Sequence, residues 1–148
     1  ARTGQSTAGA THLIKVAAQT ALGQRAKMDI FGTDYPTPDG TCVRDYIHIK
    51  DLAQAHILGL APGKIGFYNL GNGDGYSVKE VIQMCEKITG VKIPAIEKPR
   101  RAGDPPKLVA AATKAITELG WKPQYPKLED IVATAWAWHK KHPNGYAD

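Results

Sequence analysis

Apolar side chains recur every three or four positions in several segments, which is the spacing of a helix with one buried face. The clearest case begins at Ser77 and Glu80, which have the spacing of a capping box, and ends at Gly90, a common helix stop. Its apolar face is Val78, Val81, Ile82, Cys85 and Ile88. The same pattern predicts five helices, at residues 12–22 (with Thr11 as the N-cap), 51–60, 78–89, 113–119 and 128–139.

Short apolar or alternating runs between these helices predict strands. They cover residues 28–31, 41–49, 67–70 and 91–96, and residues 108–111 are expected to be extended. Strands that alternate with helices favour an α/β or α+β arrangement. No period repeats along the chain, so a solenoid is not indicated.

The segment from Ile30 to Leu52 combines an irregular half with a strand-like half. Two glycines and two prolines lie among threonines and aspartates between residues 32 and 40, a composition that disfavours regular structure. The strand that follows carries Arg44 and Asp45. Ordered loops on rigid scaffolds often hold ligands, so this loop is a candidate ligand cover. A surface loop with an exposed arginine explains the pattern equally well.

Composition limits the classes of protein that fit. The 148 residues are 43% hydrophobic and 22% charged, enough to bury one core. Nineteen Lys and Arg against 14 Asp and Glu leave a charge of +5, which suits a phosphate-bearing ligand but is too scattered to predict nucleic-acid binding. Cys42 and Cys85 have no CxxC spacing, which is typical of a reduced, cytoplasmic protein. No apolar run approaches a membrane span. The chain begins at Ala1 in a polar stretch, so we expect a piece of a longer protein.

Two motifs resemble catalytic or cofactor sites. Tyr46 and Lys50 match Tyr-x-x-x-Lys, but that pair works on a helix, and in the strand expected here the two would lie roughly 13 Å apart. The glycines from Gly71 to Gly75 lack the last glycine of G-x-G-x-x-G, because Tyr76 stands there. We interpret the first as a chance match and the second as a tight turn. The five histidines have no metal-ligand spacing, so no metal site is predicted.

A second basic loop is a better binding candidate. Arg100, Arg101 and Asp104 offer guanidinium groups for a diphosphate and a carboxylate for a sugar hydroxyl. Arg44 would need a partner if it were buried on its strand. The residues alone also allow a solvated basic loop.

Taken together, five stretches resemble a known family. IFGTDYPTPDGTCVRDYIHIKDLAQAH, FYNLGNGDGYSVKEVI, KPRRAGDPPKLVA, ELGWKP and DIVATAWAWHKKHPNGY are similar, in order and spacing, to the C-terminal half of the UDP-glucose 4-epimerases. These belong to the extended short-chain dehydrogenases/reductases, with an α/β fold. The resemblance runs from about residue 11 to 148 and implies the substrate-binding part, including elements that complete the nucleotide-binding sheet. Residues 1–10 would be a linker.

The resemblance implies roles for individual residues. Phe31 would border the uracil, and the backbone of Asp29, Ile30 and Phe31 would read its edge. Arg44 and Arg101 would bind the diphosphate of a UDP-hexose. Asp104 would hydrogen-bond the ribose.

Two further positions depart from or vary within the family pattern. His12 and Leu13 align with an Asn-Leu pair that touches the diphosphate in the family. Histidine in place of asparagine is a departure from the family pattern, so the contact of His12 does not follow from the resemblance. Leu108 stands where a tyrosine is associated with restricting the pocket to unacetylated sugars. Leucine leaves room for N-acetylhexosamines.

The resemblance also implies what lies elsewhere. NAD and the catalytic residues would belong to an N-terminal half, so we expect no catalytic residue in this chain and no turnover by it alone. The whole protein would interconvert UDP-galactose and UDP-glucose through a 4-keto sugar, as a cytoplasmic homodimer. Without that half, apolar surface and a strand edge would be exposed, favouring self-association. Another NAD-dependent sugar-nucleotide epimerase or dehydratase, or a stand-alone nucleotide-sugar-binding module, are the alternatives.

Overall fold

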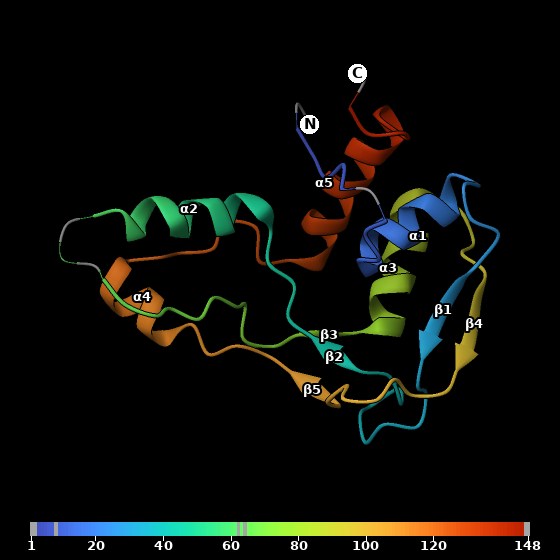
Figure 1. Cartoon of the computed structure of the whole chain (residues 1–148), viewed down its shortest axis with the longest axis horizontal. Coiled ribbons are helices and arrows are strands. Elements are labelled where there is room, and N and C mark those ends of the chain that lie inside the picture. Colours follow the sequence, from blue (N-terminus) through green and yellow to red (C-terminus); the bar gives the residue numbers. More distant parts are fainter. Residues whose placement is uncertain (1–2, 8, 62, 64, 147–148) are drawn as a thin grey trace.

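The computed structural model describes residues 3–7, 9–61, 63 and 65–146. Helices are interspersed with short strands along the chain, and the strands form two small sheets (Figure 1). The helices are α1 (Leu13–Ala21), α2 (Ile49–Gly59), α3 (Val78–Thr89), α4 (Thr113–Leu119) and α5 (Leu128–Lys141). The strands are β1 (Met28–Phe31), β2 (Val43–Arg44), β3 (Tyr76–Ser77), β4 (Ala95–Lys98) and β5 (Lys107–Leu108). The predicted α/β class is confirmed.

The helix predictions are confirmed in number and close in extent. Ser77 Oγ accepts from the Glu80 backbone N–H at 3.0 Å, and the Glu80 carboxylate accepts from the Ser77 N–H at 2.7 Å, so the capping box is present. Gly90 ends α3 with φ of 71°. The predicted N-cap Thr11 is wrong: His12 is the N-cap of α1, and its ring lies 2.6 Å from the Gln5 amide nitrogen instead of capping the helix.

The strand predicted over residues 41–49 is too long, because side chains replace the ladder hydrogen bonds after the Asp45 N–H, which still donates to the Leu108 carbonyl at 3.2 Å. β2 pairs with β3 and β5 over Val43 and Arg44 alone. The Asp45 carboxylate then accepts from the backbone N–H groups of Asn72 and Ala110, at 3.0 and 3.2 Å. These bonds end the ladder, and of the predicted extended segment 108–111, only Leu108 lies in β5.

Two other strand predictions need correction. Residues 67–70 form no strand, because no neighbouring strand within the described part of the chain supplies hydrogen-bond partners. The strand predicted over residues 91–96 begins later, at Ala95. The Ile93 N–H donates to the Glu86 carboxylate at 2.9 Å, and Pro94 has no N–H, so hydrogen bonding to β1 begins at the Pro94 carbonyl, which accepts from the Met28 N–H at 2.9 Å.

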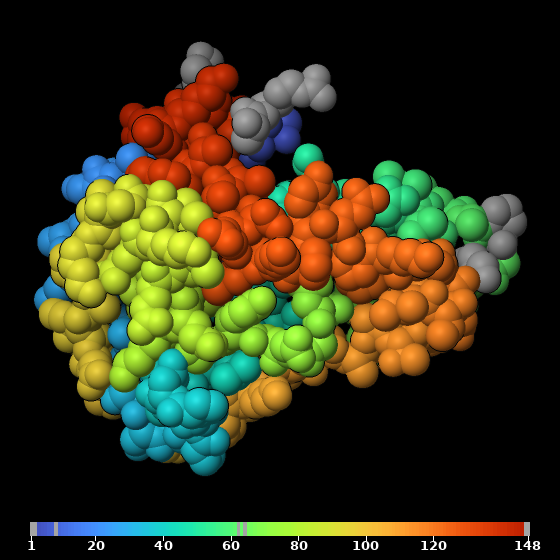
Figure 2. Space-filling model, turned by 180° about the vertical axis from the view of Figure 1, so that it is seen from behind, coloured from blue at the N-terminus to red at the C-terminus, as the bar shows by residue number. Residues whose placement is uncertain are grey.

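The described chain contains two apolar cores. The first lies between α1, α3 and α5 and the parallel pair β1–β4; Figure 1 shows these elements gathered at one end. The second is smaller and lies between α2 and α4, around the fully buried Trp121. The three-stranded sheet, in the order β3–β2–β5, lies between the two ends. Seen from behind, α3 and α5 form one face and α4 packs toward the other end (Figure 2).

Asp51 joins α2 to the segment between α4 and α5. Its buried carboxylate accepts from the backbone N–H groups of Gln124 and Tyr125, both at 2.9 Å. Its carbonyl accepts from the Trp121 indole N–H at 2.9 Å. A buried carboxylate is stable only with such partners. The three hydrogen bonds of Asp51 therefore hold α2 to the segment between α4 and α5.

Large apolar side chains are exposed at and after the C-terminal end of α2. Leu60 is 83% exposed, Ile65 99% and Phe67 98%. Ile57 on the helix is also exposed. Exposed apolar surface is what the family resemblance leads us to expect in the absence of an N-terminal half. None of the described helices has both the length and the apolar character that crossing a membrane requires.

Candidate functional site

Arg44 lies at the centre of the three-stranded sheet, paired with Tyr76 of β3 and Leu108 of β5. Its Nη1 donates to the carbonyl oxygens of Val43 at 2.8 Å and Pro105 at 2.9 Å. These bonds direct the guanidinium toward the loop before β5. There its Nη2 lies 3.4 Å from Asp104 Oδ1, a long ion pair. The expected partner of Arg44 is therefore Asp104.

Asp104 connects Arg44 to the second arginine. Its Oδ2 accepts from Arg101 Nε at 2.9 Å, and its side chain is about one quarter exposed. The Arg101 guanidinium lies over the ring of Phe31, with its Cζ 4.8 Å from the ring centroid. The structure thus brings together four of the predicted site residues, from β1, β2 and the loop before β5. We call Phe31, Arg44, Arg101 and Asp104 the arginine cluster.

The arginine cluster combines an exposed aromatic face with two cations and one carboxylate. Phe31 is 37% exposed at the end of β1. Arg101 also remains largely exposed, so it can exchange its carboxylate partner for a ligand at little cost. Such a surface can bind a flat aromatic group beside an anion.

The loop between β1 and β2 is held by its own hydrogen bonds. Asp39 accepts from the Thr41 N–H at 2.9 Å, from the Thr41 hydroxyl at 2.7 Å, and from the Ser77 hydroxyl at the start of α3. Burial raises the pKa of the Asp39 carboxyl, but the hydrogen bonds from Ser77 and Thr41 outweigh burial and lower the pKa overall. Gly40 has φ of 78° and touches the Thr33 carbonyl, so no side chain fits there. These hydrogen bonds hold the loop between β1 and β2 in one conformation and so fix the distance between Phe31 and Arg44.

Arg100 does not point into the arginine cluster. Its Nε donates to Asp34 Oδ1 at 2.7 Å, and its Nη2 bonds the Asp34 carbonyl. Its guanidinium covers the buried ring of Tyr35, with Cζ 4.2 Å from the ring centroid. The hydrogen bond from Arg100 lowers the pKa of the Asp34 carboxyl. Arg100 therefore joins the two loops, a role that the sequence reasoning missed because Asp34 and Arg100 are 66 positions apart.

The remaining predicted residues lie in three places. Ile30 faces the first core from β1, whereas Asp29 is exposed on the strand. Leu108 is 60% exposed beside Arg44 in the sheet. His12 and Leu13 begin α1, and Leu13 packs on the first core. Across the described residues, no hydrogen bond or ion pair joins His12 to the arginine cluster.

The Tyr46 and Lys50 motif does not form a helical pair. Tyr46 precedes α2, whereas Lys50 lies in its first turn with Nζ 3.5 Å from the Tyr125 hydroxyl. Burial raises the pKa of Tyr46 to about 12, which disfavours its use as a base. The pair therefore lacks the shared helix face on which Tyr-x-x-x-Lys chemistry depends, although it does not lie on the expected strand either.

The glycine run does not fit a dinucleotide. The Asn72 N–H is bonded to Asp45, and its side-chain N–H donates to the Tyr46 carbonyl at 2.5 Å. The backbone N–H groups at the N-terminus of α3 are already bonded, to the Glu80 carboxylate, the Cys42 carbonyl and the hydroxyls of Thr41 and Ser77. A pyrophosphate needs such N–H groups to be free, so these residues do not form an NAD site. No cluster of three or more His, Cys, Asp or Glu suited to a metal occurs among the described residues.

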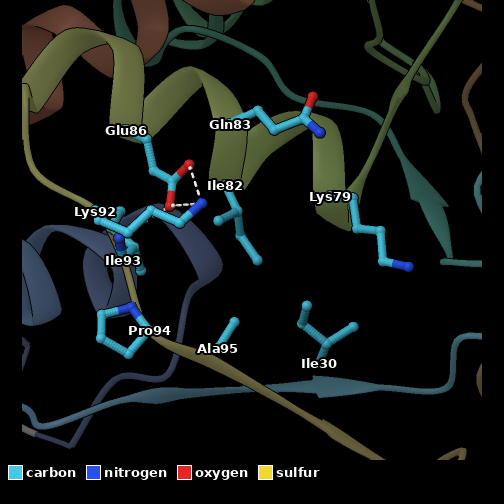
Figure 3. Close-up of a pocket in the computed structure, with 9 residues that line it drawn as sticks. All are labelled: Ile30, Lys79, Ile82, Gln83, Glu86, Lys92, Ile93, Pro94 and Ala95. Carbon is cyan, nitrogen blue, oxygen red and sulfur yellow. Dashed lines mark hydrogen bonds and ion pairs between the residues drawn. The ribbon is translucent and has the colours of Figure 1, made fainter.

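A cavity of about 290 Å³ lies between α3 and the strands β1 and β4 (Figure 3). Ile30, Ile82 and Ile93 give it an apolar floor. The two lysines on its rim are paired with carboxylates: Lys92 with Glu86 at 3.0 Å, and Lys79 with Glu97 at 3.6 Å. The charges of the two lysines on the rim of the cavity are therefore already compensated.

Comparison with known proteins gives consistent matches. The family model described as GDP-mannose 4,6 dehydratase matches residues 3–134. A UDP-glucose 4-epimerase of Halalkalibacterium halodurans is 53% identical over 150 residues, which is 99% of this chain and 45% of that protein. A crystal structure of a UDP-glucose 4-epimerase superposes with a TM-score of 0.95 at 52% identity, covering 99% of this chain and 46% of that one.

A third match carries ligands. The UDP-glucose 4-epimerase from Bifidobacterium longum, solved in complex with NAD+ and UDP, has a TM-score of 0.84 at 44% identity over 91% of this chain and 41% of its own. The chain therefore spans less than half the length of the proteins it matches, and it corresponds to their C-terminal part.

Proposed function

Because this chain belongs to the family described as GDP-mannose 4,6 dehydratase, we propose that it is the nucleotide-sugar-binding part, residues 11–148, of a UDP-glucose 4-epimerase. The observation that carries the proposal is the convergence of Phe31, Arg44, Arg101 and Asp104 on one surface. The names of the similar proteins support the choice of UDP-hexose as ligand.

The diphosphate would bind between the two arginines. Arg44 is held rigidly by two backbone carbonyls, whereas Arg101 is exposed and adjustable. A diphosphate carries charge on both phosphates, so one fixed and one adjustable guanidinium can each meet one of them. Asp104, released from Arg101, would accept a hydrogen bond from a ribose hydroxyl.

The uracil would lie against Phe31. The backbone of residues 29–31 would read the base edge, because β1 is paired with β4 on one side alone among the described strands. Leu108 would face the sugar from the neighbouring strand. Holding UDP by base and diphosphate leaves the hexose free to turn, which an inversion at its C4 requires.

The hydride chemistry is assigned to the rest of the protein. The Bifidobacterium structure was solved with NAD+, and in this chain the N–H groups that follow the glycine run, at the start of α3, are already bonded. The proposal accordingly places no catalytic residue in this chain, and the whole protein would act in galactose metabolism as a cytoplasmic homodimer. His12 and Leu13 would contribute at the margin of the diphosphate.

Calorimetry with UDP on the intact protein tests the binding proposal. Replacing Arg44 or Arg101 by alanine removes a charged hydrogen bond of about 1.5–3 kcal/mol, so UDP should bind about tenfold or more weakly. Lys122→Ala removes an exposed charge away from the arginine cluster and should leave the affinity unchanged. Equal affinity in all three variants would overturn the proposed site.

The family description favours one competing activity, the dehydration of a sugar nucleotide. Incubating the intact protein separately with UDP-galactose, UDP-glucuronate and GDP-mannose separates the readings. Epimerisation predicts that UDP-galactose becomes UDP-glucose. Turnover of one of the other two substrates in its place would assign a different reaction, and UDP binding without any turnover would favour a binding module.

A further inference from the structure

A polar cleft of about 600 Å³ lies away from the arginine cluster. Its walls come from residues 5–7 and Gly9 near the N-terminus, from α1 and the turn after it, and from the C-terminal end of α5 with residues 143–145. Gln24 closes one end, because its side-chain N–H donates to the Pro143 carbonyl at 3.0 Å. This volume lies within the range of about 300–1,000 Å³ that small-molecule sites usually have.

The cleft is basic and contains no carboxylate among its lining residues. Lys15, Arg25 and His139 line it together with amide and hydroxyl side chains. Lys15 Nζ donates to the Thr7 carbonyl at 2.6 Å, and Arg25 Nε donates to the Gln19 side-chain oxygen at 2.8 Å. Both acceptors are neutral, so neither positive charge is compensated by an ion pair within the described part of the chain.

The contrast with the cavity between α3 and the strands β1 and β4 is informative. There, each rim lysine is paired with a glutamate, and the floor is apolar. Here, the two cations keep donors available: the terminal nitrogens of Arg25 have no hydrogen-bond partner among the described residues. Unpaired cations that face one concave polar surface raise the local concentration of anions.

His139 adds a polar group at the inner wall. It is 7% exposed on α5 and lines the cleft. Burial, together with the nearby charge of Lys15, lowers the pKa of His139, so the ring is neutral near pH 7 and offers one donor and one acceptor. The amides of Gln5, Gln19 and Asn144 offer more. Such groups suit hydroxyls better than apolar atoms.

We propose that this cleft binds a small hydroxylated phosphate ester, with Lys15 and Arg25 on the phosphate and the amide-lined wall on the hydroxyls. The site shares no residue with the arginine cluster, and it stands whether or not the chain binds a UDP-hexose. Free phosphate would meet the same two cations, so recognition of the hydroxyl groups is what distinguishes a phosphate ester from free phosphate at this site.

The test uses the intact protein saturated with UDP, so that the arginine cluster is blocked. Three compounds are titrated in separate experiments: glucose 6-phosphate, inorganic phosphate and glucose. Binding is measured by calorimetry and by the shifts of the amide NMR signals. Glucose 6-phosphate should bind and shift the amides of residues 5–9, 24–25 and 143–145. Inorganic phosphate should bind at least about tenfold more weakly, because the hydroxyl contacts are missing, and glucose should not bind.

Two variants assign the phosphate contact. Lys15→Gln and Arg25→Gln should each weaken glucose 6-phosphate binding about tenfold, whereas the control Lys122→Gln should not. UDP affinity should be the same in all three. The proposal is overturned if glucose 6-phosphate fails to bind, if it binds to both variants as tightly as to the wild type, or if the shifts occur outside the cleft. Equal affinity for inorganic phosphate would show an anion site without hydroxyl recognition, which also contradicts it.

Discussion

Asp104 accepts a hydrogen bond from Arg101 Nε at 2.9 Å, so a carboxylate occupies one of the two guanidinium groups that are proposed to bind a diphosphate. The same carboxylate lies 3.4 Å from Arg44. Asp104 thus holds both arginines near one another, and its negative charge lowers the positive charge of the cluster.

Replacing Asp104 by asparagine should therefore have opposite effects on two ligands. Inorganic pyrophosphate should bind more tightly, because one negative charge is removed from between the arginines. Uridine should bind more weakly, because a charged acceptor for the ribose is lost, at about 1.5–3 kcal/mol. Calorimetry with each ligand on the intact protein measures both effects. A change of the same sign for the two ligands would contradict the proposed exchange.

Leu108 should set the size of the sugar that fits. Leu108→Tyr adds a ring on the exposed side of β5, beside Arg44. We expect turnover of UDP-N-acetylglucosamine by the intact protein to fall about tenfold or more, because the new ring would clash with the acetamido group. Turnover of UDP-galactose, which has no acetamido group, should change little. Leu108→Met is the matched control, because it keeps a flexible apolar side chain. Equal loss for both substrates would mean that the position does not discriminate.

His48 should make folding stability depend on pH. Its Nδ1 accepts from the Lys50 N–H at 3.1 Å as the cap of α2, and its Nε2 lies 2.9 Å from the Thr134 hydroxyl. Burial lowers the pKa of His48 below 6.5, and Lys50 lowers it too, whereas Asp51 and Asp130 oppose this. Since the folded pKa is below the unfolded one, the stabilisation is complete above pH 6.5 and is lost as the pH falls through the folded pKa.

Thermal unfolding between pH 8 and pH 5 measures this dependence. The wild type should lose stability below about pH 6.5. His48→Asn keeps a capping acceptor that does not titrate, so its midpoint should change less over the same range, although it is lower at pH 8. The exposed His56→Asn is the control, and its profile should follow the wild type. A wild-type midpoint that rises on acidification would reverse the expected sign.

The 148-residue chain on its own should self-associate and should not epimerise UDP-galactose. The exposed side chains of Leu60, Ile65 and Phe67 provide the driving force, because burying one such side chain contributes about 1.5–3 kcal/mol. Phe67→Lys and Ile65→Lys should shift light scattering toward the monomer. Val91→Lys, at an exposed apolar position elsewhere, should not. A monodisperse wild-type monomer at high concentration, or measurable turnover, would refute the corresponding half of this prediction.

The sequence determined the helices well, because their signals are local. The apolar spacing of residues 78–88 and the capping box of Ser77 and Glu80 act within a few residues, and both appear in the structure as expected. Strands depend on partners that are distant along the chain. Residues 67–70 have strand-like side chains but no neighbouring strand in the described part of the chain, so they remain irregular.

The candidate site divides in the same way. The residue types and the family resemblance identified Phe31, Arg44, Arg101 and Asp104 from the sequence. Only the tertiary structure decided how they pair: Asp104 joins two arginines that are 57 positions apart in the numbering, whereas Arg100, next to Arg101, turns away to Asp34. The direction of a charged side chain depends on which oppositely charged group the fold brings within reach, and local sequence does not contain that information.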